Sequence, residues 1–185
     1  MTKKILILLI IFNTNITILF ASTKENIILN FKKIENITFK FKQTINEKTE
    51  EGNCIIQYPK KINCKYDNKR EKVMISNGKT LIVKDIRNYY RYPLKRTPLD
   101  IILDKNLLIK QMSNLNGKLI DEKYYNFFLN NNNNKINIFF DKKTYDLIGW
   151  QTEDIYQNLV ITFIYNIEKN KKIDQTLFKL PELLN

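Results

Sequence analysis

The chain has 185 residues, of which 43% are hydrophobic and 27% are charged, and its 31 Lys and Arg against 19 Asp and Glu give a formal net charge of +12. This length and composition exclude a disordered or fibrous protein and indicate one globular domain. The basic residues are nearly all lysines scattered along the chain, without clustered arginines or a nucleic-acid-binding module, so we expect no nucleic-acid partner.

Residues 1–21 have the pattern of a secretory signal peptide. Two lysines precede the apolar run Ile5–Phe12, and the small residue Ala21 follows a second apolar run. Polar residues at 13–15 interrupt the apolar stretch, which falls short of the roughly 18 residues that a membrane-spanning helix needs. An uncleaved anchor is the alternative. We expect cleavage near Ala21, which leaves a mature domain of residues 22–185 in an oxidising compartment.

The mature chain begins with a predicted helix, followed by strands. Ile27, Ile28, Phe31 and Ile34 follow helical spacing, so residues 24–35 predict an amphipathic helix. Period-two alternation and turn residues then predict strands within 37–45, 53–58, 62–66, 72–76, 80–85 and 88–92.

A second helix is predicted in the middle of this β-rich chain. Pro98 suits a first helical turn after Thr97 as its cap, so residues 98–110 predict one helix. Its apolar side consists of Leu99, Ile102, Leu103 and Leu107. Strands resume within 122–129, 135–140, 146–150 and 158–167. The chain is therefore predicted to be mainly β with helices (α+β), in antiparallel strands. Whether the space beneath the helices is a pocket or a filled core stays open.

The two cysteines, Cys54 and Cys64, lie on strand-like runs on either side of a turn at residues 58–61. Opposite residues of such a hairpin have numbers that sum to about 118 to 120, and these two sum to 118. A zinc site is excluded because the chain has no histidine and two thiols do not complete a tetrahedral site. Two buried free thiols and a cross-strand disulfide remain, and we expect the disulfide.

The usual residues of acid–base, metal and phosphate chemistry are missing from the sequence. It has no histidine and no glycine-rich phosphate loop. Adjacent carboxylates, such as Asp121 with Glu122 and Glu153 with Asp154, point to opposite sides of a strand and are expected to be solvated surface groups. The sequence therefore favours a binding protein without a metal or cofactor over an enzyme.

The order of several short segments carries a family resemblance. After the first helix come "FKQ" at 41–43, Gly52 opening a strand that ends in "YP" at 58 and 59, "SNGKTL" at 76–81 and "RTPLDIIL" at 96–103. This series resembles the periplasmic outer-membrane lipoprotein carrier family, LolA. The match runs from about residue 24 to the mid-100s and rests on the ordered set, since no single segment is specific.

The resemblance implies a single curved antiparallel sheet that forms an unclosed β-barrel with an α-helical lid over a hydrophobic cavity. It also implies a periplasmic monomer that accepts acylated lipoproteins from an ATP-driven inner-membrane transporter and delivers them to an outer-membrane acceptor. A carrier of another lipid or glycolipid and a non-enzymatic envelope interaction protein are the alternatives. The candidate residues of cavity and lid are Ile27, Phe31, Ile34, Phe39, Phe41, Ile56, Leu99, Ile102 and Leu103.

One position departs from the family pattern. Well-studied members carry an arginine immediately before the proline that matches Pro59, and this arginine hydrogen-bonds the closed lid. Tyr58 occupies that position here, and we expect its hydroxyl to act as the lid latch with a single hydrogen bond. The resemblance also implicates Pro59 and Ile62 in docking to the transporter.

Overall fold

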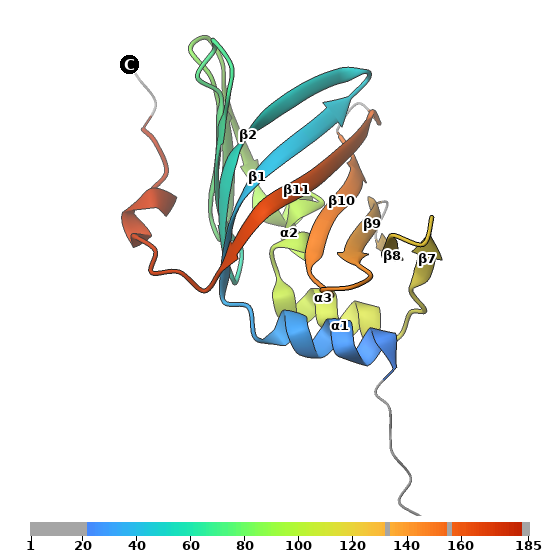
Figure 1. Ribbon diagram of the computed structural model, residues 1–185. Helices are drawn as coiled ribbons and strands as arrows, with labels where there is room; N and C mark the ends of the chain where they lie inside the picture. The colour runs from blue at the N-terminus through green and yellow to red at the C-terminus, as the bar shows by residue number, and fades with distance from the viewer. Residues whose placement is uncertain (1–21, 132–133, 155–156, 183–185) are drawn as a thin grey trace, which may run out of the picture.

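The computed structural model describes residues 22–131, 134–154 and 157–182 (Figure 1). The predicted signal peptide and its cleavage site lie outside these residues. The strands are β1 (Asn36–Ile45), β2 (Lys48–Gln57), β3 (Lys61–Tyr66), β4 (Val73–Asn77), β5 (Thr80–Lys84), β6 (Tyr89–Pro93), β7 (Lys118–Ile120), β8 (Tyr124–Asn131), β9 (Asn134–Asp141), β10 (Leu147–Glu153) and β11 (Leu159–Lys169). The helices are α1 (Thr23–Lys32), α2 (Leu99–Ile102) and α3 (Lys105–Ser113), with 3₁₀ turns η1 (Leu94–Arg96) and η2 (Gln175–Phe178).

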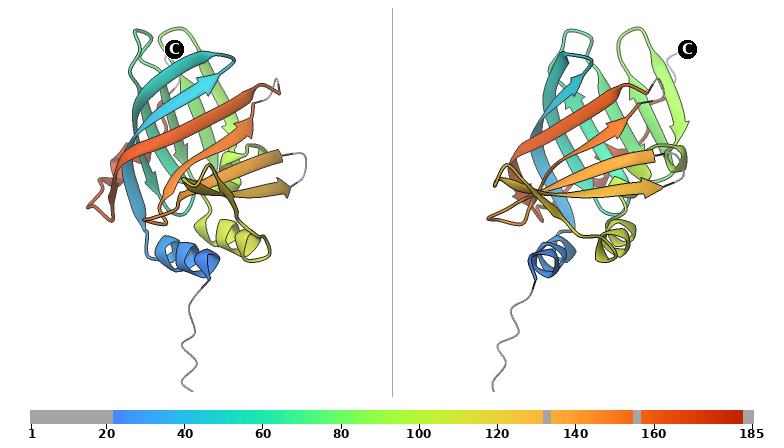
Figure 2. Two further views of the ribbon diagram at one scale, coloured as in Figure 1. Left: turned by 45° about the vertical axis from the view of Figure 1, so that its right-hand side comes forward. Right: turned by 90° about the vertical axis from the view of Figure 1, so that its right-hand side faces the viewer.

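The strands form one antiparallel sheet in the order β6-β5-β4-β3-β2-β1-β11-β10-β9-β8-β7. The first strand pairs with the last, so the two halves of the sheet meet along β1 and β11. The sheet curves strongly, but β6 and β7 do not pair with each other and remain its edges (Figure 2). The predicted mainly β fold with an unclosed barrel is confirmed. The short edge strand β7 was not predicted.

Alternation along the strands produces the core on the concave face. Phe39, Phe41 and Ile56 point inward and are at most 2% exposed. Inward residues of β8 to β11 are buried with them in the same core. Gly52 lies between Phe41 and Tyr66 in the register, and the two rings meet across it at 4.9 Å. A Cβ at Gly52 would lie 2.1 Å from the Lys65 carbonyl oxygen, so only glycine fits there.

The helix α1 begins with a capping box. The Ser22 hydroxyl accepts from the Glu25 N–H, and the Glu25 carboxylate accepts from the Ser22 N–H at 2.6 Å. Ile27 and Phe31 form its buried side. The helices α1 and α3 lie side by side across one end of the curved sheet (Figure 2). The first predicted helix is therefore confirmed, although it ends three residues earlier than expected.

The second predicted helix is wrong as a single element. Residues 98–110 form α2 and the first part of α3, with a break at Leu103 and Asp104. The Asp104 carboxylate accepts from the Leu107 N–H at 3.0 Å and caps α3, as Asp does at helix starts. The predicted cap Thr97 is also wrong, because its hydroxyl donates to the Leu94 carbonyl at 2.8 Å instead.

The hairpin of β2 and β3 has the expected register. Cys54 pairs with Cys64 and Ile56 with Ile62. The two cysteines are joined in a disulfide, with Cα atoms 4.1 Å apart, and both are buried on the concave face.

Removing this disulfide should destabilise the fold. It joins residues ten apart, and a loop that short contributes about 2 to 3 kcal/mol in the chain-entropy model. We expect the Cys54→Ala, Cys64→Ala variant to lose that much free energy of unfolding in urea titration. Reductant should shift the wild type by a similar amount and leave the double variant unchanged. Identical urea midpoints for the oxidised and reduced wild type would contradict the prediction.

The segment after β11 packs on the convex face of β3 to β5. Ile75 and Ile82 point to this side and are buried, as is Phe178 of η2. The side-chain amide of Asn63 donates to the Leu177 carbonyl at 2.6 Å, and the Tyr89 hydroxyl donates to the Pro181 carbonyl at 3.2 Å. The chain thus covers part of the outer face of its own sheet.

Candidate functional site: an apolar cavity beside a helical lid

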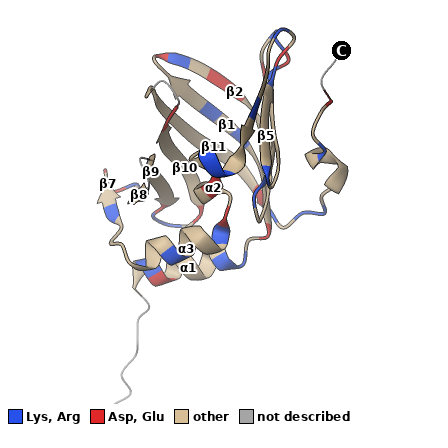
Figure 3. Ribbon diagram, turned by 180° about the vertical axis from the view of Figure 1, so that it is seen from behind, with Lys and Arg blue, Asp and Glu red and all other residues tan. Residues whose placement is uncertain are grey.

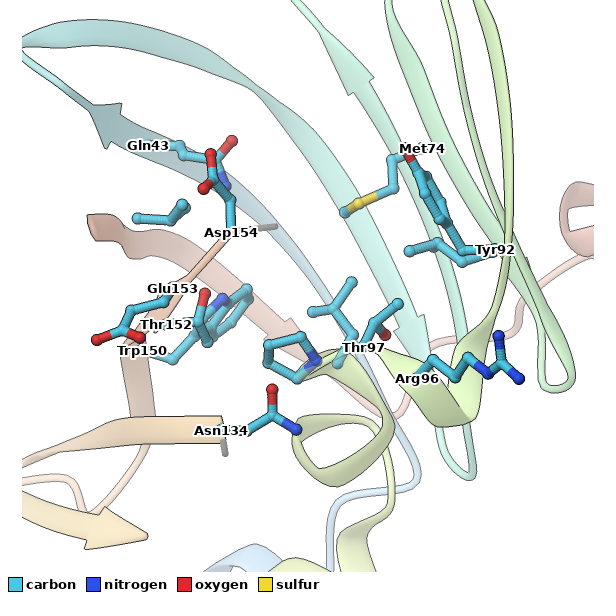
Figure 4. A pocket seen from close by; sticks show the side chains of 14 residues that line it. Gln43, Met74, Tyr92, Arg96, Thr97, Asn134, Trp150, Thr152, Glu153 and Asp154 are labelled. Atoms are coloured by element: carbon cyan, nitrogen blue, oxygen red, sulfur yellow. The ribbon is translucent and has the colours of Figure 1, made fainter. Parts of the chain in front are cut away.

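A cavity of about 440 Å³ lies on the concave side of the sheet, next to α2 (Figure 4). Met74 and Tyr92, from β4 and β6, line one side, and Trp150 and Thr152 of β10 lie across from them. Leu99, at the start of α2, also lines the cavity. Leu81, Pro98 and Val160 add to the apolar surface, and Arg96, Thr97, Asn134 and Glu153 add polar groups at its margin.

Polar groups of the cavity lie mainly on the side of β1 and β10, and two of them, Gln43 and Asp154, bond to residues beside the cavity. The Gln43 amide donates to the Thr162 hydroxyl at 3.0 Å, and its oxygen accepts from the Tyr66 hydroxyl at 3.3 Å. Burial raises the pKa of Tyr66, with a further contribution from Glu50, so this hydroxyl keeps its proton near neutral pH. The carboxylate of Asp154 accepts from the backbone and the side-chain amide of Asn158, each at 2.9 Å. These contacts suit a binding surface rather than acid–base chemistry.

We refer to α1, α2 and α3 together as the lid. Lys105 at the start of α3 donates to the Ile34 carbonyl at 2.7 Å and to the Lys32 carbonyl at 3.0 Å, at the C-terminal end of α1. At the other end, Lys24 of α1 donates to the Ser113 carbonyl at 2.9 Å. Cations satisfy the unpaired carbonyls of helix C-termini, so α1 and α3 fasten each other at both ends.

Lys60, in the turn between β2 and β3, ties the lid to the sheet. Its ammonium lies 2.9 Å from a carboxylate oxygen of Asp100 in α2, and 3.5 Å from one of Asp104 in the break between α2 and α3. Its backbone N–H donates to the Leu103 carbonyl at 2.7 Å. The hydrogen bond with Asp100 raises the pKa of Lys60, so the ammonium stays charged. We call these contacts the Lys60 latch.

The Lys60 latch was not predicted, because the family resemblance points to position 58, which directly precedes Pro59. A signal was present, since Asp100 and Asp104 are four residues apart and fall on one side of a helical segment. The sequence alone does not distinguish Lys60 from the other lysines, because only the fold brings it next to both carboxylates.

Tyr58 does not latch the lid as predicted. Its side chain is buried and its hydroxyl has no hydrogen-bond partner, so the expected bond is not made. Instead, its ring meets Phe31 of α1 edge-on at 5.5 Å, and the Lys105 ammonium lies 5.9 Å from its centroid. The lid therefore rests on this ring through apolar and cation–π contact.

The two docking candidates have different positions. Pro59 is exposed in the turn, where a partner could contact it. Ile62 is completely buried on the concave face, opposite Ile56, because it lies at an inward position of β3. A buried side chain cannot form a docking contact, so the prediction for Ile62 is wrong.

Of the nine cavity and lid candidates, only Leu99 lines the cavity. The others are at most 3% exposed and belong to the core between lid and sheet: Ile27, Phe31, Ile34, Phe39, Phe41, Ile56, Ile102 and Leu103. The remaining wall residues were missed because strand alternation alone does not say which face is concave.

Neither a membrane-spanning helix nor a cluster of metal ligands occurs in the described part of the chain. Its helices include none long and apolar enough to span a membrane. The Cys, Asp and Glu side chains of this part form no group of three or more that could hold a metal ion.

Comparisons with known proteins place the chain in a family. A family model described as outer membrane lipoprotein carrier protein LolA matches residues 32–181. A comparison with curated proteins found no match. Among solved structures, a LolA superfamily protein from Nitrosomonas europaea is 8% identical with a TM-score of 0.46, covering 86% of this chain and 99% of that chain. A putative outer membrane lipoprotein-sorting protein domain from Vibrio parahaemolyticus is 6% identical with a TM-score of 0.49, covering 84% and 94%.

Lipoprotein LppX from Mycobacterium tuberculosis is 9% identical, with a TM-score of 0.41 and coverage of 82% of this chain and 96% of that chain. The assignment to a family depends on the family model, whose match extends from α1 to the segment that follows η2. Because this match spans most of the chain, the protein belongs to the LolA family of outer membrane lipoprotein carrier proteins.

Proposed function

We propose that this protein is a non-enzymatic periplasmic carrier, which binds acyl chains of lipoproteins released from the inner membrane and delivers them to the outer membrane. The observation that carries the proposal is a mostly apolar cavity of about 440 Å³ on the concave side of the sheet, next to α2, which the Lys60 latch holds to the sheet. A cavity with apolar walls and few polar groups is the type of site that binds an apolar ligand.

The energetics of acyl chains require such a cover. Each methylene group withdrawn from water contributes about 0.8 kcal/mol, so a chain of ordinary length resists entering water by roughly 10 kcal/mol. A lipoprotein with several chains therefore cannot cross an aqueous compartment uncovered.

With the lid against the sheet, the cavity has room for about one chain. If a methylene group occupies roughly the volume of a water molecule, about 30 Å³, a cavity of about 440 Å³ accepts about fifteen such groups. Further chains require the lid to move away from the sheet. That movement would expose the lid underside, so Ile27, Phe31, Ile34, Ile102 and Leu103, with the facing Phe39, Phe41 and Ile56, are our proposed contacts for additional chains.

A carrier must also release its cargo. This requires a closed and an open state of similar free energy, which the loading and unloading partners bias. We propose an ATP-driven inner-membrane transporter and an outer-membrane acceptor as these partners, with the exposed Pro59 at the docking turn of a monomeric carrier.

A transfer assay tests the proposal directly. The mature protein is mixed with proteoliposomes that contain the cognate transporter and an acylated lipoprotein, with and without ATP. We expect a soluble one-to-one complex that forms only with ATP. The same lipoprotein without its acyl chains is the control and should stay uncomplexed. Equal capture of both forms would overturn acyl-chain recognition. If no complex forms and extracted protein contains a glycolipid, the alternative cargo is favoured.

Occupation of the cavity can be followed through Trp150, the single tryptophan of the chain. Bromine quenches a tryptophan that it contacts, so a fatty acid brominated along its chain should quench Trp150 fluorescence saturably, at about one per protein. The unbrominated acid is the control and should compete without quenching. Binding without quenching would place the acyl chain outside this cavity.

A further inference from the structure

The convex face of β8 to β11 carries an apolar area that the described chain leaves uncovered. Leu159, Ile161, Phe163 and Tyr165 alternate outward along β11, and Phe128 of β8 points to the same side. Their exposure is 50% for Phe128, 46% for Leu159 and 42% for both Phe163 and Tyr165. We call these five residues the outer patch. Within it, the Phe163 ring stacks on the largely buried ring of Phe139, with centroids 5.6 Å apart.

The other half of the convex face, on β3 to β5, is covered by the chain itself. There the segment that contains η2 packs against β3 and β4, and Ile75, Ile82 and Phe178 are buried on this face. Large exposed apolar areas on a soluble protein mark a protein or membrane contact. The outer patch is therefore a candidate contact surface, in contrast to the covered area on β3 to β5.

Charge distribution indicates which partner fits. Asn137 and Gln151 separate the apolar residues of the outer patch, and charged residues of β8 to β11 are confined to strand ends (Figure 3). Two lysines of β1 border the patch, with Lys42 paired in register to Phe163 and Lys40 to Tyr165. Lys42 lies 3.8 Å from Glu51, and both side chains are more than half exposed, so that ion pair is weak.

We propose that the outer patch docks the protein on an anionic lipid bilayer. Aromatic and aliphatic side chains enter the interfacial region of a bilayer, and neighbouring lysines attract anionic headgroups. Four of the five residues follow β11 on the convex side, so this strand can meet a flat surface. Inward residues of the same strand, Val160 and Ile164, belong to the cavity and core, so docking through the opposite face leaves the cavity accessible.

Sedimentation with lipid vesicles tests this inference. The vesicles contain phosphatidylglycerol with phosphatidylethanolamine, or phosphatidylcholine alone, and no lipoprotein, so the outcome is independent of the proposed function. At low salt we expect the protein to bind the anionic vesicles, and to bind phosphatidylcholine vesicles at least about tenfold more weakly. Binding to the anionic vesicles should weaken as added salt screens the lysines.

Two double variants locate the contact. Phe128→Gln with Leu159→Gln removes two half-exposed side chains without touching the core, and Lys40→Glu with Lys42→Glu reverses the charge at the border. Each should weaken binding to anionic vesicles at least about fivefold. Matched controls are Tyr90→Gln, which is 50% exposed on β6, and Lys65→Glu, exposed on β3; both should bind like the wild type. Thermal melts verify that every variant is folded.

Three results would overturn the inference. They are an absence of sedimentation with anionic vesicles at low salt, an equal loss in the control variants, and a loss in the lysine variant with none in the apolar variant. The last would mean that the general positive charge of the chain, rather than the outer patch, attracts the lipid.

Discussion

A Lys60→Met variant is expected to hold its lid open about five times more often than the wild type. Methionine keeps much of the length of the side chain but removes the ammonium that contacts Asp100 and Asp104. A hydrogen bond to a charged group contributes about 1.5 to 3 kcal/mol when buried, and partial exposure of Lys60 reduces this to about 1 kcal/mol. Hydrogen exchange of the amides of α2 and α3 measures the opening, and acyl cargo should dissociate faster by a similar factor.

Two control variants test whether the effect is specific to the Lys60 latch, and not to the loss of any lysine or to any change near the turn. Lys65→Met removes an exposed lysine on the convex face of β3 and should leave exchange in the lid unchanged. Tyr58→Phe removes a buried hydroxyl that has no partner, so the closed state should be equally stable or more stable by about 1 kcal/mol. If Tyr58→Phe opened the lid and Lys60→Met did not, the latch would belong to Tyr58 after all.

The latch of this protein is thus charged, although its sequence has an aromatic residue where the resemblance suggests an arginine. Lys60 lies two positions further along the same turn and meets carboxylates that the break between α2 and α3 presents. Position 58 therefore does not need to carry the charge, and its aromatic ring packs against Phe31 of α1. The turn and the lid remain coupled, because the Lys60 backbone also donates to the Leu103 carbonyl.

The sequence predicted those features that follow from local periodicity. Alternation identified the strands from Phe39 to Ile164. The positions of Cys54 and Cys64 about the turn predicted the register of β2 against β3. Helical spacing identified α1 but joined α2 to α3, since the apolar side of residues 98–110 continues through the break. The break is set by the Asp104 cap and the Lys60 contacts, and the latter depend on a residue far away in the sequence.

The cavity could not be predicted residue by residue for a related reason. Inward and outward positions of a strand are distinguished only when the direction of sheet curvature is known. Ile62 and Met74 show both outcomes: the residue expected at a docking surface is buried, and a residue with no predicted role lines the cavity. Apolar residues on the convex face, such as Phe163, cannot be told from core residues by composition alone.

A Met74→Trp variant is expected to reduce acyl cargo capture at least about tenfold while the protein stays folded. Met74 points into the cavity from β4, opposite Trp150, and the larger ring would occupy space that an acyl chain needs (Figure 4). Adding bulk to a filled core costs about 1 to 3 kcal/mol, but at Met74 the ring enters empty volume, so the free energy of unfolding should change by less than about 1.5 kcal/mol. Co-purification with acylated cargo and urea titration measure the two quantities.

The matched control for this variant is Met74→Leu. It conserves volume, so both capture and stability should remain close to wild type. A Met74→Trp protein that folds and still captures cargo normally would show that this cavity is not where acyl chains bind. The core beneath the lid would then be the principal site, and the same assay on Lys60→Met, whose lid opens more often, should show altered capture. The two variants therefore distinguish a cavity that already exists in the closed state from one that forms only when the lid moves.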